Sequence, residues 1–261
     1  MKRIALTLTI SLLLLAVAAA QENPKAGNGA KPEPKADTKA AATPTVDEIL
    51  AKQVQAVGGK EAIEKLTSRT SKGTIELEGM GMSGTVETFS KAPNKNAVVI
   101  TLSGFGTVNN VFDGSSGWSS DPMSGLRELS GAELTTLKRD SDFYGAINLR
   151  KHFSKMELKG KEKVGSSDAW VIEATPAEGS PEKLYFDVAS GLLIRHDAER
   201  ESPQGKMPVE IYTDDYQTVD GVRVPYSIRQ VTPAFTLSIK LTEVKHNTPI
   251  EDAKFGKPAA Q

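Results

Sequence analysis

Residues 209–241 read VEIYTDDYQTVDGVRVPYSIRQVTPAFTLSIKL, and this stretch decides the fold class. Apolar residues alternate with mostly polar or charged ones in three runs, at 209–211, 222–228 and 237–241. Side chains of a strand point alternately to its two faces, so a period of two is typical of strands that bury one face. The stretch therefore predicts antiparallel strands with one face in a core and the other in solvent.

The same alternation continues upstream, in runs separated by Gly, Pro, Asn, Asp or Ser. These runs lie at residues 74–78, 85–89, 98–102, 108–112, 156–164, 170–174 and 183–188. Their spacing predicts a meander in which consecutive strands are neighbours. Two segments depart from the period of two and predict helices: residues 45–66 before the first strand and 130–153 in the middle of the chain.

Each helical segment begins with a candidate capping box. Thr45 is followed three residues later by Glu48, and Ser130 by Glu133. In a capping box the hydroxyl accepts from the third residue of the helix, whose carboxylate accepts in return from the backbone of the cap. The segments predict a strongly curved antiparallel sheet with helices over its concave face. A β-sandwich is the alternative, but it does not need two helical segments.

The N-terminal part of the chain predicts export. Residues 1–20 contain Lys2 and Arg3, a short apolar run and a final Ala-Ala-Ala, the order of a cleaved signal peptide. A membrane anchor is the alternative, but the run is shorter than the roughly 20 residues that span a bilayer. Residues 21–44 are rich in Pro, Lys and Ala and predict a disordered linker, either a spacer or a docking tail. Residues 45–261 are expected to fold as one domain. The mature protein is expected to be periplasmic and soluble.

The composition excludes some partners and sites. The formal net charge is −1 with 25% charged residues, so nothing draws the chain toward nucleic acid. There is no Cys, which rules out disulfides, thiolate metal sites and lipidation at a cysteine. The aromatic content of 6% suits a core but not a large aromatic binding platform.

Four segments together resemble a known family. They are VDEILAKQVQAVGGKEAIEKL (46–66), FDGSSGWSSDPMSG (112–125), YFDVASGLLIR (185–195) and DYQTVDGVRVPYSIR (215–229). In this order they are similar to the periplasmic lipoprotein-carrier superfamily represented by LolA and LolB, especially its outer membrane lipoprotein-sorting-protein-like members. The resemblance implies a mainly β fold with some α structure. This is an incomplete, half-open antiparallel β-barrel of about ten to eleven strands with helical lid segments. Its hollow accepts the acyl chains of a lipoprotein or another lipid.

The candidate ligand-binding residues follow from which apolar side chains share the inner face of the strands. They are Val98, Ile100, Leu102, Phe112, Trp118, Trp170, Ile172, Leu184, Phe186, Ile211, Tyr226, Leu237, Ile239 and Leu241. The alternative role for each is packing in a filled core, because a sequence does not distinguish a hollow barrel from a filled one. A carrier requires an apolar pocket of roughly several hundred Å³.

Other motifs favour ordinary structure over chemistry. Residues 79–82, Gly-Met-Gly-Met, predict a hairpin turn, with an adaptable methionine lip as the alternative. Residues 113–117 predict a turn, since they lack the ligand spacing of a calcium loop. His152, His196 and His246 have no metal-ligand spacing, although His196 shares its strand face with apolar residues.

The sequence contains no nucleophile elbow or phosphate-binding loop, so we expect a protein that is not an enzyme and has no cofactor or metal. The leading hypothesis is a periplasmic carrier or chaperone for lipid or lipoprotein acyl chains, possessing a helical lid. The alternative is a cell-envelope interaction module with a filled β core and a protein partner.

Overall fold

The computed structural model describes residues 43–202 and 205–259 of the chain. Thirteen antiparallel strands form a single sheet in the order β6-β5-β4-β3-β2-β1-β13-β12-β11-β10-β9-β8-β7. The strands are β1 (Ser68–Glu78), β2 (Met82–Lys91), β3 (Lys95–Leu102), β4 (Gly106–Phe112), β5 (Gly117–Asp121), β6 (Gly125–Glu128), β7 (Phe153–Val164), β8 (Ser167–Pro176), β9 (Glu182–Asp187), β10 (Leu193–Ser202), β11 (Gly205–Val219), β12 (Val222–Val231) and β13 (Thr236–His246). The helices are α1 (Val46–Ala56), α2 (Lys60–Glu64), α3 (Gly131–Asp140) and α4 (Gly145–Asn148), with 3₁₀ turns at η1 (Leu149–His152) and η2 (Asp252–Phe255).

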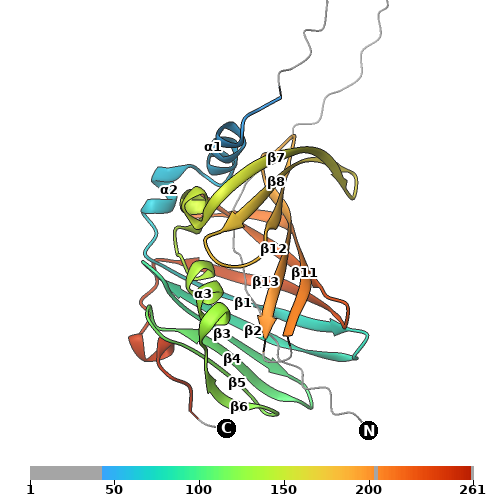
Figure 1. Cartoon of the computed structure of the whole chain (residues 1–261). Coiled ribbons are helices and arrows are strands. Elements are labelled where there is room, and N and C mark those ends of the chain that lie inside the picture. The colour runs from blue at the N-terminus through green and yellow to red at the C-terminus, as the bar shows by residue number, and fades with distance from the viewer. Residues whose placement is uncertain (1–42, 203–204, 260–261) are drawn as a thin grey trace, which may run out of the picture.

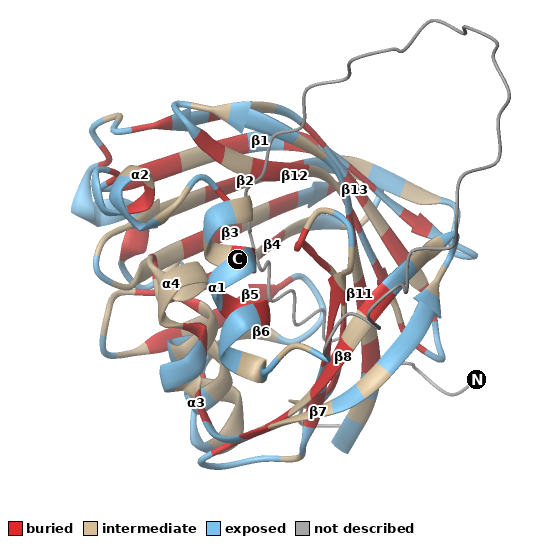
Figure 2. Cartoon of the chain, turned by 90° about the horizontal axis from the view of Figure 1, so that it is seen from above, coloured by how far each residue is buried: buried red, intermediate tan, exposed pale blue. Residues whose placement is uncertain are grey.

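The sheet is bent around its own concave side (Figure 1) and does not close, because β6 and β7 are both edge strands. In the view from above, the helices gather at the opening of the curve and buried residues line its inner side (Figure 2). The mainly β, half-open architecture expected from the sequence is confirmed.

The main core fills the concave face between the sheet and the helices. Alternate residues of the strands supply it, among them Ile75, Ile100, Ile172, Val209 and Ile239. Two smaller clusters lie on the other face, and the C-terminal turn η2 covers one of them by placing Phe255 against Val111. The fold is therefore a curved sheet whose inner face holds most of the buried apolar surface.

The predicted strand number of about ten to eleven is too low. The strands that the alternation did not reveal are β5, β6 and β10. The sequences of β5 and β6, GWSSD and GLRE, contain few apolar residues, and β10, LIRHDAERES, is mostly polar or charged. Ser119, Ser120 and Asp121 are buried in β5 even though they are polar. A pattern of apolar residues does not detect strands that bury small polar side chains.

The two predicted capping boxes have different outcomes. At Thr45 the hydroxyl accepts from the Glu48 backbone N–H at 3.2 Å, and Glu48 Oε2 accepts from the Thr45 N–H at 2.7 Å, so this box is confirmed. At Ser130 the prediction is wrong, because its side chain makes no capping hydrogen bond. Glu133 instead binds both terminal nitrogens of Arg127 at 2.7 Å, a bidentate pair that is stronger than a neutral capping bond.

The central helical segment links the two halves of the curved sheet. Helix α3 packs against β5, where a Cβ built at Gly117 would lie 2.7 Å from Leu137 Cδ2. Its C-terminal end reaches β9, because Arg139 forms an ion pair with Glu182 at 2.7 Å. None of its residues is fully buried. Helix α3 thus spans the concave side without being part of the core, whereas Phe143, Leu149 and Phe153 from the rest of the segment belong to it.

Candidate functional site

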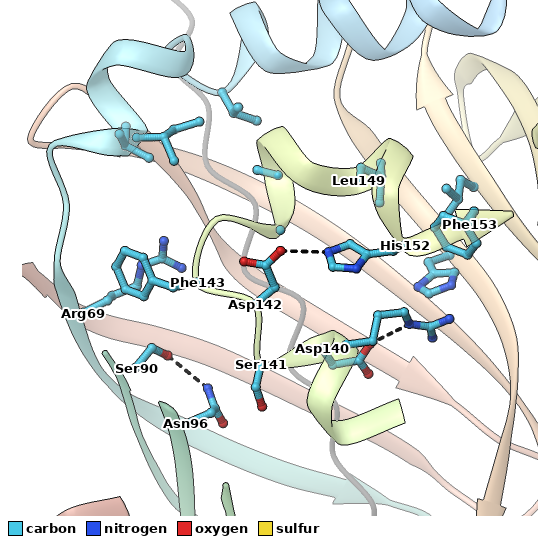
Figure 3. A pocket seen from close by; sticks show the side chains of 18 of the residues that line it. Arg69, Ser90, Asn96, Asp140, Ser141, Asp142, Phe143, Leu149, His152 and Phe153 are labelled. Atoms are coloured by element: carbon cyan, nitrogen blue, oxygen red, sulfur yellow. Dashed lines mark hydrogen bonds and ion pairs between the residues drawn. The ribbon is translucent and has the colours of Figure 1, made fainter. Parts of the chain in front are cut away.

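A cavity lies between the central helical segment and the concave face of the sheet. Its volume is about 80 Å³. Side chains from α2, β1, β2, β3, β9, β10 and β12 line it, together with several between Arg139 and Phe153. Figure 3 shows the labelled lining residues converging from the helices and strands. Pockets for small molecules usually measure roughly 300–1,000 Å³, so this cavity is smaller than the one expected from the sequence.

One part of the cavity wall is apolar. Its side chains come from the α1–α2 connection, from the segment between α3 and β7, and from the strands: Val57, Ile63, Phe143, Ala146, Leu149, Phe153, Leu184 and Val222. Phe143 packs edge-on against Tyr144, whose hydroxyl donates to the Leu66 carbonyl at 3.0 Å. These contacts hold the loop before α4 against the start of β1.

The opposite part of the wall contains a buried network of charges. Glu182 accepts from Arg139 at 2.7 Å and lies 2.7 Å from His196 Nε2. Arg200 lies 3.2 Å from Asp140 and 3.8 Å from Glu182. Burial alone would raise the pKa of Glu182, but the hydrogen bond with His196 and the charges of His196, Arg139 and Arg200 outweigh it and lower the pKa to about 2. The network therefore fixes the end of α3 to β9 and β10.

A second polar pair lies closer to α4. His152 Nε2 is 2.9 Å from Asp142 Oδ2, and the two side chains face each other in Figure 3. Burial would raise the pKa of Asp142, but hydrogen bonds from His152, Asn148 and the Tyr144 backbone lower it. The pair ties the loop after α3 to the turn before β7.

Arg69 forms the third polar group, at the start of β1. Its Nε donates to His246 Nε2 at 3.2 Å, and its guanidinium lies over the Phe143 ring at 5.6 Å. Burial lowers the pKa of Arg69 to about 10. Burial and the Arg69 charge lower the pKa of His246 to about 4, although its Nδ1 lies 3.2 Å from Asp220. His246 is therefore neutral at pH 7, with Nδ1 as its donor.

Two buried polar atoms in the cavity wall have neither a hydrogen-bond nor an ion-pair partner in the described part of the chain. They are Ser141 Oγ and His196 Nδ1. Buried groups of this kind normally bind water or a ligand, since leaving one unpaired costs about 1–3 kcal/mol. The cavity can therefore accept a molecule that has polar as well as apolar groups.

The predicted ligand-binding residues lie mainly in the main core. Ten of them are buried there: Val98, Ile100, Leu102, Ile172, Leu184, Phe186, Ile211, Leu237, Ile239 and Leu241. Trp170 and Tyr226 pack against this core half-buried, and Phe112 is fully buried. Trp118 packs against the outer cluster that contains Val111 and Phe255. Leu184 is the one that also lines the cavity among the described residues, and a ligand-binding role for the fourteen stays a prediction.

The charged cavity residues were not predicted as a site. The alternation along the strands could have indicated them. Glu182 lies two and four residues before the buried Leu184 and Phe186, so all three side chains share one face of β9. His196 and Arg200 are four residues apart and share one face of β10 in the same way. His196 was expected to point inward or to be hydrogen-bonded in the wall, and it does both. The carboxylate that pairs with each histidine is distant in sequence, so spacing did not reveal it.

The other motifs are turns. Gly79-Met80-Gly81 links β1 to β2, with both glycines at positive φ. Asp113 Oδ1 accepts from the backbone of Ser115 and Ser116 at 2.8 Å, which closes the turn between β4 and β5. In residues 43–202 and 205–259, no three potential metal ligands of the His, Cys, Asp or Glu type gather in one group. No described helix has the length and apolarity needed to cross a membrane. The predicted signal peptide and predicted linker, residues 1–44, lie outside the described residues except for residues 43 and 44, and they stay predictions.

Comparison with known proteins identifies the fold. No protein-family model and no curated protein matches the sequence. Among solved structures, a DUF1329 family protein from Desulfovibrio piger is similar at a TM-score of 0.54 and 16% identity, covering 82% of this chain and 98% of the other. An outer membrane lipoprotein-sorting protein domain from Vibrio parahaemolyticus is similar at a TM-score of 0.53 and 11% identity, and the match covers 80% of this chain and 95% of the other. A LolA superfamily protein from Nitrosomonas europaea is similar at a TM-score of 0.53 and 15% identity, and the match covers 82% of this chain and 99% of the other. With its half-open sheet and covering helices, the chain has a LolA-like fold.

Proposed function

We propose that this protein is an exported, periplasmic carrier that binds a lipid, or the acyl chains of a lipoprotein, between its concave sheet and its helices, without catalysing a reaction. The supporting observation is the cavity under the central helical segment, which is lined by both apolar side chains and buried polar groups. An amphiphile suits such a wall, because its chain leaves water at a gain of roughly 25 cal/mol per Å² while its polar group finds partners.

Uptake requires the helices to move. The cavity of about 80 Å³ is smaller than an engineered cavity of about 150 Å³ that holds benzene, so it does not accept a long chain as it stands. Helix α3 is the element that moves, since it has no buried residue of its own. Its last turn contacts the sheet through Leu137, against Gly117 of β5, and through Arg139, which pairs with Glu182 of β9. Elements with few buried contacts open at the lowest cost.

A titration of delipidated protein with a fluorescent fatty acid tests the binding. We expect saturable binding by the parent protein. We expect Ala146→Trp, whose larger side chain fills the cavity from α4, to lower the affinity for the fatty acid about tenfold or more, which corresponds to roughly 1.4 kcal/mol of binding free energy. The matched control is Ala189→Trp in the exposed turn between β9 and β10, which leaves affinity unchanged. A flat titration of the parent protein overturns the proposal and favours an interaction module.

An engineered disulfide tests the lid. Because the chain has no Cys, Gly117→Cys with Leu137→Cys introduces the only thiols, at positions where α3 touches β5. Oxidation is expected to abolish uptake, and reduction of the same sample to restore it. Equal uptake in both states would exclude α3 as the lid and leave the cavity proposal to the titration above.

A further inference from the structure

Four neighbouring hairpin turns lie at one end of the strands, and none of their residues is charged. Residues 79–81, 103–105, 122–124 and 232–235 connect contiguous strands between β6 and β12, and they read GMG, SGF, PMS and TPAF. Not one of these thirteen residues is charged, in a chain with 25% charged residues. We call these four turns the apolar edge.

Contacts between the hairpins place the turns side by side. The Ser103 N–H donates to the Ser83 carbonyl at 2.9 Å, which sets the second turn beside the first. A Cβ built at Gly106 would lie 2.7 Å from Pro122 Cγ, so the third turn touches the second. Glu78 pairs with Thr236, which brings the fourth turn beside the first. Figure 1 shows the β1–β2 hairpin and the hairpins of β3–β6 ending on the same side of the molecule.

The apolar edge presents large apolar side chains to solvent. Met80 is 37% exposed and Met123 is 51% exposed, and they are the two exposed large apolar side chains among the described residues. The tips protrude, because a Cβ built at Gly79, Gly81 or Gly125 meets no atom within 4 Å. Exposed methionines are flexible and apolar, and on neighbouring protruding turns they offer an adaptable apolar contact surface.

The exposed tips are continuous with the main core. Met82 and Phe105 are half-buried and pack against that core, while Phe235, from the fourth turn, is buried within it. The second and fourth turns are therefore joined to the main core through Phe105 and Phe235.

We infer that the apolar edge docks on the surface of a lipid bilayer, inserting Met80, Met123 and the side of Phe105 among the acyl chains near the headgroups. A protein partner fits the edge less well. A stable protein interface buries about 800 Å² on each partner and uses roughly 20–30 residues a side, with about ten hydrogen bonds. The four turns together have thirteen residues. Flexible methionines adapt to a fluid apolar phase. This inference goes beyond the proposed function, because it concerns the sheet edge and not the cavity.

The absence of charge in these turns sets the lipid preference. Attraction to anionic headgroups requires Lys or Arg at the contact, at roughly 1 kcal/mol for each. The four turns have none, so we expect docking on neutral phosphatidylcholine vesicles that is no stronger on anionic ones and that persists at 0.5 M salt.

Vesicle flotation tests the inference, using protein purified as a bacterial host exports it and phosphatidylcholine vesicles. The double variant Met80→Glu/Met123→Glu is expected to float about tenfold less than the parent. The control, Ser166→Glu/Ala189→Glu, introduces the same charges in exposed turns at the opposite sheet edge and is expected to float like the parent. All three proteins share one N-terminus, so any binding by that segment is common to them.

Several outcomes overturn the inference. They are no flotation of the parent, equal flotation of the two double variants, and flotation that depends on anionic lipid and is lost in salt. A parent that is dimeric in sedimentation equilibrium, does not float and becomes monomeric in Met80→Glu/Met123→Glu would assign the edge to self-association instead. Unchanged thermal unfolding of both variants verifies that they fold, as expected at exposed positions.

Discussion

His196 Nε2 lies 2.7 Å from Glu182 Oε2, and both side chains are buried in the wall of the cavity. The same carboxylate binds Arg139 of α3, so a single side chain connects the sheet to the helix above it. Its removal is a direct test of how firmly the helix is held.

Glu182→Ala is expected to lower the free energy of unfolding by about 3–5 kcal/mol, because it leaves the charges of Arg139 and Arg200 buried with one partner fewer. Urea denaturation measures the change. Glu243→Ala removes an exposed carboxylate that lies 2.6 Å from Lys245, and no measurable loss is expected there. Equal effects of the two substitutions would show that the buried network does not hold α3.

The low pKa of Glu182 predicts an acid-dependent loss of stability. Its folded pKa of about 2 lies below the ordinary value of 4.5, so the unfolded chain binds the proton more readily. The stabilisation is complete above about pH 5 and is lost as the pH falls toward 2. Urea midpoints between pH 6 and 2.5 are expected to fall less steeply for Glu182→Gln than for the parent, and parallel curves would contradict the prediction.

His246 predicts a separate window at higher pH. Its folded pKa of about 4 lies below the ordinary 6.5, so folding favours the neutral ring. This contribution is present above pH 6.5 and is lost as the pH falls to 4, before Glu182 titrates. Two-dimensional NMR of the imidazole follows it directly, and a midpoint near 6.5 in the folded protein would refute the assignment.

The contacts of Arg195, on the outer face of the sheet, predict that a lysine at this position stabilises the fold less than the arginine does. Its guanidinium binds Asp197 at 2.6 Å and Glu210 at 2.8 Å, and it lies between the rings of Tyr185 and Tyr212. Arg195→Lys keeps the charge but loses the planar stacking and the forked contact, so we expect a loss of about 1 kcal/mol. The same substitution at Arg150, which makes one exposed contact of 3.8 Å, is the control and should cause no change in urea denaturation.

The close approach of β3 to Gly84 in β2 predicts that any side chain at this position destabilises the fold. A Cβ there would lie 1.9 Å from the Thr101 carbonyl oxygen of the neighbouring strand, so β2 and β3 would have to separate. We expect Gly84→Ala to destabilise the protein by about 1–3 kcal/mol. Gly145→Ala at the start of α4 has room, with 3.9 Å to the nearest atom, and its thermal midpoint should not fall.

The sequence predicted the elements that bury alternating apolar residues, including the strands that contain Ile100 and Ile239, and it predicted both helical regions. The alternation of apolar residues did not reveal β5, β6 or β10; in β5 the polar Ser119 and Ser120 are buried, one on each face of the strand. The site was harder to predict for a different reason. Glu182, His196 and Arg139 come together only because the sheet curves under α3, and no local spacing encodes that approach.

The strand order has a consequence for how the protein folds. Strands β1–β6 and β7–β13 are two meanders whose neighbours are consecutive in the chain, and one seam joins them, where β1 pairs with β13. That seam links positions such as Arg69 and His246, 177 residues apart. Each meander can assemble from local contacts, but pairing β1 with β13 joins residues far apart in the chain and costs loop-closure entropy before it is stabilised. We therefore expect this seam to form late in folding, so that β13 closes the curved sheet after both meanders have assembled.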